Sequence, residues 1–147
     1  MEQRFHMLLY RAFHAQRSRL RPRLRELGLG PGQPKLLSYL DRRGPCRQKE
    51  LADYFEVDPA AVSRMLEVLQ RGGFLTRRTD DQCRRRDLVE LTDAGHEAAR
   101  LWNAACREME EQMLQGFAPE ERERFADYLL RARQNLQTRE GDAPWET

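Results

Sequence analysis

The segment that begins at Pro59 combines small side chains with one long cationic side chain. Ala60 and Ala61 allow the backbone to approach another molecule closely, and either methyl group could touch the methyl group of a thymine. Ser63 can hydrogen-bond a phosphate or a base edge, whereas Arg64 can make a bidentate contact with guanine. These residue types fit a helix that enters the major groove of DNA.

Three successive arginines, Arg84, Arg85 and Arg86, lie in a polar segment at residues 80–86. The flanking segments alternate like strands, so we expect the arginines in the projecting loop of a hairpin. Such arginines gain little from surface ion pairs, but on DNA they would release counterions or enter a narrow minor groove. Because neighbours along a hairpin point to opposite sides, not all three can reach DNA equally. The alternative is a solvated turn in which they pair with nearby aspartates.

Two short helices are expected before this hairpin, at residues 48–55 and 59–70, joined at a corner at residues 56–57. Asp58 is expected to cap the second helix, with proline in its first turn. Arg47, Gln48 and Lys49 open the first helix and are suitably placed for phosphates, which position a protein without reading sequence. The pattern predicts a helix-turn-helix, although an ordinary helical hairpin with a solvated face remains the alternative.

The rest of the chain reads as helices around this central module. Apolar periodicity and the Gly and Pro breakers predict a long helix over residues 2–27 with a kink at Pro22, then a breaker at 28–34 and a short helix at 35–40. Strands are expected at 74–79 and 87–91. A helix at 94–114, capped by Thr92-Asp93, and a last helix from Pro119 complete the chain. The expected fold class is therefore mainly α with a small β-hairpin.

Both terminal regions carry more apolar surface than a small central module could cover. Exposing such stripes is costly, so pairing with a second copy is expected, and an intramolecular helical core is the alternative. The residues in need of partners include Leu101, Trp102, Met109 and Met113, and those expected to form the dimer interface are Phe5, Leu8, Leu9, Phe13, Phe117, Phe125, Leu129 and Leu130.

A chain of 147 residues with 39% apolar and 34% charged residues is expected to form one soluble domain. It has no apolar stretch of membrane-spanning length and no signal peptide pattern, so a cytoplasmic protein without membrane contact is expected. Residues 1–30 hold seven arginines against two acids, whereas residues 108–147 hold ten acids against five arginines. Phosphate would repel that acidic end, so we expect a nucleic-acid face to exclude the last helix.

The cysteines and histidines point to neither a metal site nor a catalytic site. Cys46 and Cys106 are expected in the core, whereas Cys83 is expected to be exposed beside arginines that favour its thiolate form. Redox sensing through Cys83 is therefore an alternative mode of regulation. The three histidines lack a carboxylate cluster, and no phosphate loop or catalytic motif is present. An enzyme, a cofactor and a bound metal are not expected.

Taken together, the motifs resemble the MarR family of winged helix-turn-helix regulators over essentially the full chain. The resemblance lies in Gln48-Lys49-Glu50-Leu51-Ala52, in Val57 to Arg64, in Gly73-Phe74-Leu75, and in Arg84-Arg85 with Leu88 to Gly95. It implies a homodimer joined through the first and last helices, which binds double-stranded DNA at a near-palindromic operator. Most relatives repress, and many release DNA when a small phenolic or other aromatic compound binds between the dimer helices and the DNA-binding lobe.

This resemblance assigns residues 31–94 to a DNA-binding lobe, and residues 1–30 and 95–147 to a dimerisation region, within one domain. Arg85 takes the place of the arginine in the family's Asp-x-Arg wing pattern, but Cys83 stands where the aspartate is usual. Arg47 stands where the family often has a Ser or Thr that caps the first helix of the motif. Glu56 stands at the corner, where the family often has glycine.

Two questions remain open from the residues alone. Apolar side chains of the first helix, together with Leu36, Leu37, Tyr39 and Trp102, could line a ligand pocket or fill the core. The module could also have lost DNA binding and instead dock an acidic protein partner through its basic hairpin.

Overall fold

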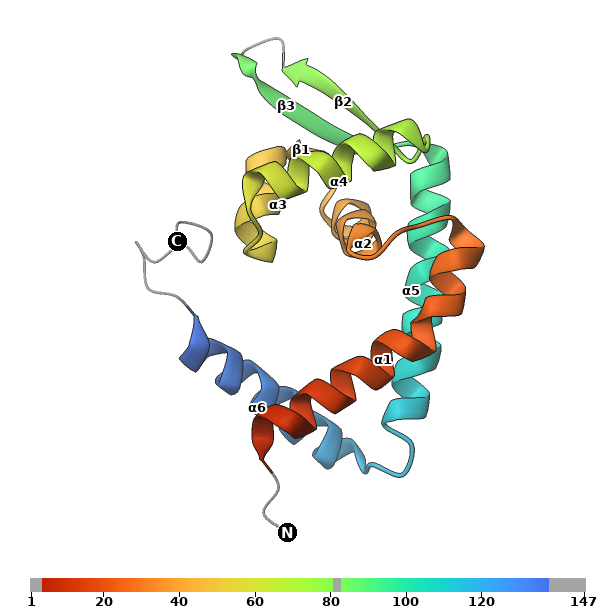
Figure 1. Ribbon diagram of the computed structural model, residues 1–147, viewed down its shortest axis with the longest axis vertical. Coiled ribbons are helices and arrows are strands. Elements are labelled where there is room, and N and C mark those ends of the chain that lie inside the picture. Colours follow the sequence, from red (N-terminus) through yellow and green to blue (C-terminus); the bar gives the residue numbers. More distant parts are fainter. Residues whose placement is uncertain (1–3, 81–82, 138–147) are drawn as a thin grey trace. The chain divides into compact units, whose positions relative to one another are not determined.

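The computed structural model describes residues 4–80 and 83–137, and for residues 79, 80 and 83–87 it describes the backbone alone. It confirms a mainly α fold with a small antiparallel sheet (Figure 1). The elements are α1 (Phe5–Leu27), α2 (Gln33–Arg43), β1 (Cys46–Arg47), α3 (Gln48–Phe55), α4 (Pro59–Arg71), β2 (Leu75–Asp80), β3 (Cys83–Leu91), α5 (Asp93–Met113) and α6 (Pro119–Leu136).

The sheet has the strand order β1-β3-β2, with every neighbouring pair antiparallel. Leu75 pairs with Leu91 at the base of the hairpin, and Asp80 pairs with Cys83 at its far end. The expected loop at residues 80–86 is therefore wrong, because Arg84–Arg86 belong to β3. A backbone ladder forms whatever the polarity of its side chains, so the polar composition did not end the strands.

The helices follow the expected periodicity, with differences at their ends. α2 begins at Gln33, two residues earlier than expected, because Pro34 fits a first helical turn, and it continues to Arg43. α1 continues through Pro22 as one helix, and Figure 1 shows its ribbon changing direction in its C-terminal part. The two-residue strand β1 was not expected, since a segment so short carries no alternating pattern.

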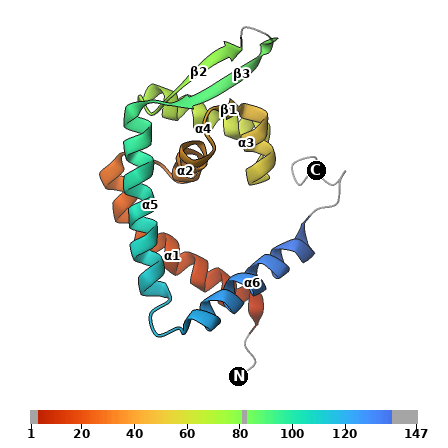
Figure 2. The ribbon, with the colours of Figure 1, turned by 180° about the vertical axis from the view of Figure 1, so that it is seen from behind.

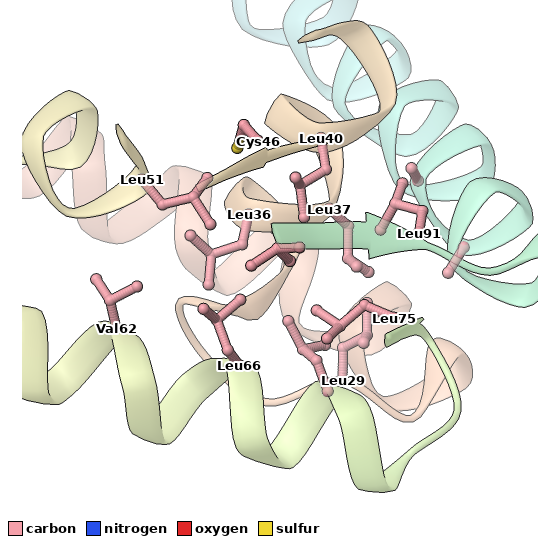
Figure 3. Packing of buried hydrophobic residues seen from close by; sticks show 14 of the residues in the cluster. Leu29, Leu36, Leu37, Leu40, Cys46, Leu51, Val62, Leu66, Leu75 and Leu91 are labelled. Carbon is pink, nitrogen blue, oxygen red and sulfur yellow. The ribbon is translucent and has the colours of Figure 1, made fainter. Parts of the chain in front are cut away.

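The main core lies where α2, α3 and α4 pack beneath the sheet, an arrangement that the view from behind shows as well (Figure 2). In Figure 3, Val62 and Leu66 point from α4 toward Leu36 and Leu51, and all four side chains are fully buried. Replacing such a leucine with alanine typically costs about 2–5 kcal/mol. A second cluster, formed by Leu20, Ala105 and Met109 with Trp102 and Cys106 against it, joins α1 to α5.

The chain divides into two compact units, with the boundary between Met109 and Glu110 inside α5. In the second unit, α6 starts at Pro119, and Glu121 accepts a hydrogen bond from the backbone N–H of Ala118 at 2.9 Å. Phe117 and Phe125 meet edge to face at 6.2 Å. None of the 18 residues of α6 is buried, so this helix lacks the packed apolar face that normally stabilises a helix.

Candidate nucleic-acid interface

A left-handed residue makes the corner between α3 and α4. Glu56 has φ 52° and ψ 48°, and among the described residues no other non-glycine residue has a positive φ. The N–H of Val57 returns to the carbonyl of Ala52 at 3.1 Å, which closes the end of α3. Asp58 occupies the N-cap position of α4 as expected, but its side chain makes no capping hydrogen bond. The corner is therefore set by the backbone of Glu56 and by Pro59.

The two faces of α4 differ sharply. Val62, Leu66 and Leu69 are buried in the core, so they fix the rotation of the helix about its axis. Of the side chains singled out in the sequence, Arg64 is exposed and has no hydrogen bond or ion pair with any described side chain. An arginine held at the surface by a packed helix, with its five donors unused by the described side chains, is suited to bind an external acceptor.

The other expected contact residues of the helix pair are distributed around it. Pro59 and Ala60 are exposed, and Ala61 and Ser63 are half-buried. Arg47 and Lys49 are exposed at the start of α3, with Arg47 at the N-cap position rather than inside the helix. Gln48 differs, because its Oε1 accepts a hydrogen bond from Nη1 of Arg77 at 3.5 Å.

Two arginines of the hairpin were not singled out from the sequence. Arg77 on β2 donates from Nε to Oε1 of Gln70 at 3.0 Å, and Arg78 forms a 3.5 Å ion pair with Glu90 across the hairpin. The alternation of β2 could have identified Arg77, because it lies two residues from the buried Leu75 and therefore shares its face of the sheet. The side chains of Arg84, Arg85, Arg86 and Cys83 lie outside the described part of the structure.

The base of the hairpin is tied to the start of α5. Thr92 donates from Oγ1 to the carbonyl of Gly73 at 2.6 Å and accepts the N–H of Gly95 at 3.1 Å, which confirms it as the helix cap. The N–H of Thr92 in turn donates to the carbonyl of Phe74 at 3.1 Å. α5 approaches so closely that a Cβ on Gly95 would lie 2.0 Å from the Phe74 carbonyl oxygen.

A polar cluster fixes α3 on α2. Glu50 accepts hydrogen bonds from the hydroxyl of Tyr39 at 3.1 Å and from Arg43 at 3.2 Å. Burial of Glu50 raises its pKa, but hydrogen bonds from Cys46 and Tyr39 and the charge of Arg43 outweigh this and hold the pKa below its usual value. Burial, with the adjacent Glu50 carboxylate, raises the pKa of Cys46 to about 12. Cys46 is confirmed as a core residue, and Cys106 is only partly buried.

A cavity of about 700 Å³ lies among α1, the start of α2 and Trp102 of α5. Apolar side chains form much of its wall, including Phe13, Leu20 and Leu24, and Arg17, Arg21, Arg25 and Lys35 line it as well. The described lining contains no acidic residue. The sequence left open whether these apolar residues line a pocket or fill the core. Leu36 and Leu37 are buried in the core, whereas Trp102 and residues of the first helix line a cavity.

The residues expected at a dimer interface are all exposed in the single chain. Their exposed fractions range from 40% for Phe117 and Phe125 to 88% for Phe5, with Leu8, Leu9, Phe13, Leu129 and Leu130 between. Met109, which was grouped with the residues in need of partners, is instead buried in the cluster that joins α1 to α5. The pairing of Met109 with Leu20 was not visible in sequence, because the two residues are far apart along the chain.

Within residues 4–80 and 83–137, no three His, Cys, Asp or Glu side chains gather in a group that could hold a metal ion. None of the helices in this described part combines the length and apolar character that a membrane span requires.

Comparisons with known proteins agree with this geometry. A model of the MarR family matches residues 27–87. YwoH of Bacillus subtilis (strain 168), an uncharacterized HTH-type transcriptional regulator, is 31% identical over 103 residues, which cover 70% of this chain and 74% of YwoH. The crystal structure of MarR has a TM-score of 0.78 at 27% identity and covers 92% of each chain. A MarR family regulator from Listeria monocytogenes, crystallised with a 26mer DNA, has a TM-score of 0.82 at 21% identity, with 92% of this chain and 90% of that one covered.

Proposed function

The chain belongs to the MarR family of DNA-binding transcriptional regulators, and from this premise we propose that it is a homodimeric repressor released from its operator by a small ligand. The observation that carries DNA binding is α4, whose buried face is locked into the core while Arg64 stands exposed on the other side. In a helix-turn-helix the N-terminal half of the second helix reads base edges in the major groove. The relative from Listeria monocytogenes, which shares the fold and was crystallised with DNA, supports DNA binding.

Each part of the surface has its own role in this proposal. Arg64 and Ser63 contact base edges, with Pro59, Ala60 and Ala61 close to the groove floor, while Arg47, Gln48 and Lys49 face phosphates. β2 and β3 form the wing, and Arg85, flanked by Arg84 and Arg86, enters the neighbouring minor groove. In a two-fold dimer the half-sites would lie about one helical turn, roughly 34–36 Å, apart.

Selection of duplexes from a random pool, followed by titration at fixed salt, tests DNA binding. We expect Arg64→Ala to weaken binding to the selected duplex by about 1–3 kcal/mol and to relax its sequence preference. Arg107→Ala, which removes the same charge from the exposed surface of α5, is the control and is expected to leave the preference unchanged. Equal affinity of the wild type for selected and scrambled duplexes would instead favour a protein-interaction module.

Unpartnered apolar surface at both ends of the chain supports the homodimer. Phe5 is 88% exposed, Leu9 58% and Leu130 57%, and α6 buries no residue of its own. Large apolar side chains left exposed on a helix face often mark protein interfaces in soluble proteins. We expect light scattering to give twice the chain mass and the double variant Leu129→Glu/Leu130→Glu to give the monomer mass. Gln134→Glu, which adds a charge to the same helix at a polar position, should stay dimeric.

The cavity beside Trp102 supports a small-molecule effector. Its volume of about 700 Å³ falls in the range of ligand sites, and its apolar wall with four cations fits an aromatic compound that carries an acidic group. It touches both α1, which belongs to the proposed dimer region, and the start of α2, which packs on α4. A ligand that favours another spacing of these parts would lower the affinity for DNA.

Fluorescence of Trp102 reports ligand binding directly when Trp145 is replaced by phenylalanine. We expect benzoate to quench this signal and to release the operator, and benzyl alcohol, which lacks the charge, to do so far more weakly. Arg21→Gln should reduce benzoate binding while the operator affinity of the free protein stays unchanged. Equal responses to both compounds would contradict the role of the four cations.

A further inference from the structure

Arg77 joins three elements of the DNA-binding lobe through one side chain. It sits on β2, where it pairs with Val89 of β3, and its side chain is half-buried. Nε donates to Oε1 of Gln70, near the end of α4, at 3.0 Å, and Nη1 donates to Oε1 of Gln48, the first residue of α3, at 3.5 Å. Arg77, which belongs to a strand of the proposed wing, therefore contacts both helices of the helix-turn-helix through one guanidinium.

The chemistry of this contact requires a guanidinium. Arginine presents several donors in a fixed planar fork, so two of them can reach two separate acceptors at once. The ammonium of lysine is a compact charge on a flexible chain and lacks this geometry. Both acceptors here are neutral amide oxygens. The hydrogen bonds therefore orient the guanidinium of Arg77 without neutralising its charge.

The hairpin is also held on the lobe by β1, whose Cys46 and Arg47 pair with Val89 and Leu88 of β3, and by the fully buried side chain of Val89. Thr92 and Gly95 fix the base of the hairpin on α5, and Leu75 fixes the first residue of β2 in the core. Beyond Leu75, Arg77 makes the described side-chain hydrogen bonds that join β2 to α4 and α3. A small change in tilt at Arg77 would become a larger displacement at the far end of the hairpin, where Arg85 lies on β3.

We propose that Arg77 is a positioning residue that sets the wing relative to α4 and α3, so that major-groove and minor-groove contacts engage one DNA site in register. This rests on the proposed function as a DNA-binding regulator. The competing role for Arg77 is a direct phosphate contact, which predicts a different dependence on salt. A lost phosphate contact weakens binding to every sequence about equally and lowers the slope of log affinity against log salt by about one.

The experiment uses the full-length protein and the duplex that the wild type selects, with a scrambled duplex as comparison. Affinities of Arg77→Met are measured at several salt concentrations, and hydroxyl-radical footprints are recorded on the selected duplex. We expect affinity for the selected duplex to fall about tenfold or more, while affinity for the scrambled duplex and the salt slope stay unchanged. In the footprint, protection of the deoxyriboses that border the outer minor groove should be lost, and protection of those beside the recognition helix should be retained.

Three further variants separate positioning from charge and from folding. Arg78→Met removes the same charge from the next residue, which points to the other face of the sheet, and should keep the minor-groove footprint. Gln70→Leu removes the acceptor at 3.0 Å but keeps Arg77 and the proposed phosphate contact of Gln48, and should reproduce the lost protection even if Arg77→Met does not fold. Arg77→Lys keeps the charge without the fork and should not restore protection.

The outcomes distinguish this inference from the proposed function. A wild type without preference for any duplex would overturn both. A wild type that binds its duplex, with a drop in salt slope for Arg77→Met and an unchanged footprint for Gln70→Leu, would overturn the positioning role alone. Full protection in all variants would do the same.

Discussion

Replacing Gly95 with alanine tests the packing that holds the hairpin on α5. Residue 95 lies in the first turn of α5, where alanine is ordinarily preferred over glycine by up to about 1 kcal/mol. The structure reverses this expectation, because the added Cβ would lie 2.0 Å from the carbonyl oxygen of Phe74 and 3.1 Å from Cδ2 of Leu91. Carbon and carbonyl oxygen usually stay about 3.3 Å apart, so the overlap is roughly 1.3 Å.

Relief of this overlap requires the backbone to move, and the cost of that movement sets the expected loss of stability. The Phe74 carbonyl accepts the N–H of Thr92 at 3.1 Å, so displacing it weakens a hydrogen bond worth about 1 kcal/mol. Overpacking of this kind adds about 1–3 kcal/mol, and the gain in helix propensity offsets part of it. We expect Gly95→Ala to lower the free energy of unfolding by about 1–3 kcal/mol, or to lower Tm by roughly 3–9 °C for a chain of this size.

Urea unfolding followed by circular dichroism, at one fixed protein concentration, measures the effect. The concentration is held fixed because a dimer's apparent stability depends on it. Ala94→Gly makes the reverse exchange at the exposed neighbouring position, so it calibrates the propensity effect alone and should cost at most about 1 kcal/mol. If Gly95→Ala unfolds at the same urea concentration as the wild type or at a higher one, the close approach of α5 to Phe74 is wrong.

Three other predictions concern the corner and the polar cluster. At Glu56, with φ 52°, glycine should be more stable than alanine by about 1 kcal/mol in urea unfolding, because only the alanine variant keeps the left-handed strain; equal stability of the two variants would contradict that backbone conformation. Since burial raises the pKa of Cys46 to about 12, mass spectrometry should find Cys46 unmodified by iodoacetamide at pH 8 in the native protein and modified in urea. Because the pKa of Glu50 is held below its usual 4.5, its carboxylate stabilises the fold at neutral pH, and this contribution is lost as the pH falls through the folded pKa. Glu50→Gln should therefore lower the urea midpoint at pH 7, with a difference that shrinks below about pH 4.5; a difference independent of pH would refute it.

The DNA-binding lobe was largely predictable because its signals are local. The buried face of α4 follows from the helical spacing of Val62, Leu66 and Leu69, and its start follows from Pro59. Thr92 capped α5 as expected. The length of the hairpin was not predictable, because hydrogen bonds between its strands, rather than apolar residues, carry the ladder past Thr79. The DNA contacts and the dimer interface remain predictions.

The sequence by itself determined where the helices lie, that a hairpin follows α4 and which residue types are available on α4, because each depends on neighbours within a few positions. Only the tertiary structure decided that Arg77 meets Gln48 and Gln70, that Gly95 has no room for a Cβ, and that α1 and Trp102 line one cavity. These features join segments separated by 7 to more than 70 positions in the chain. Periodicity along the chain determines which face of a helix is buried, whereas the distance between two such faces is fixed by packing.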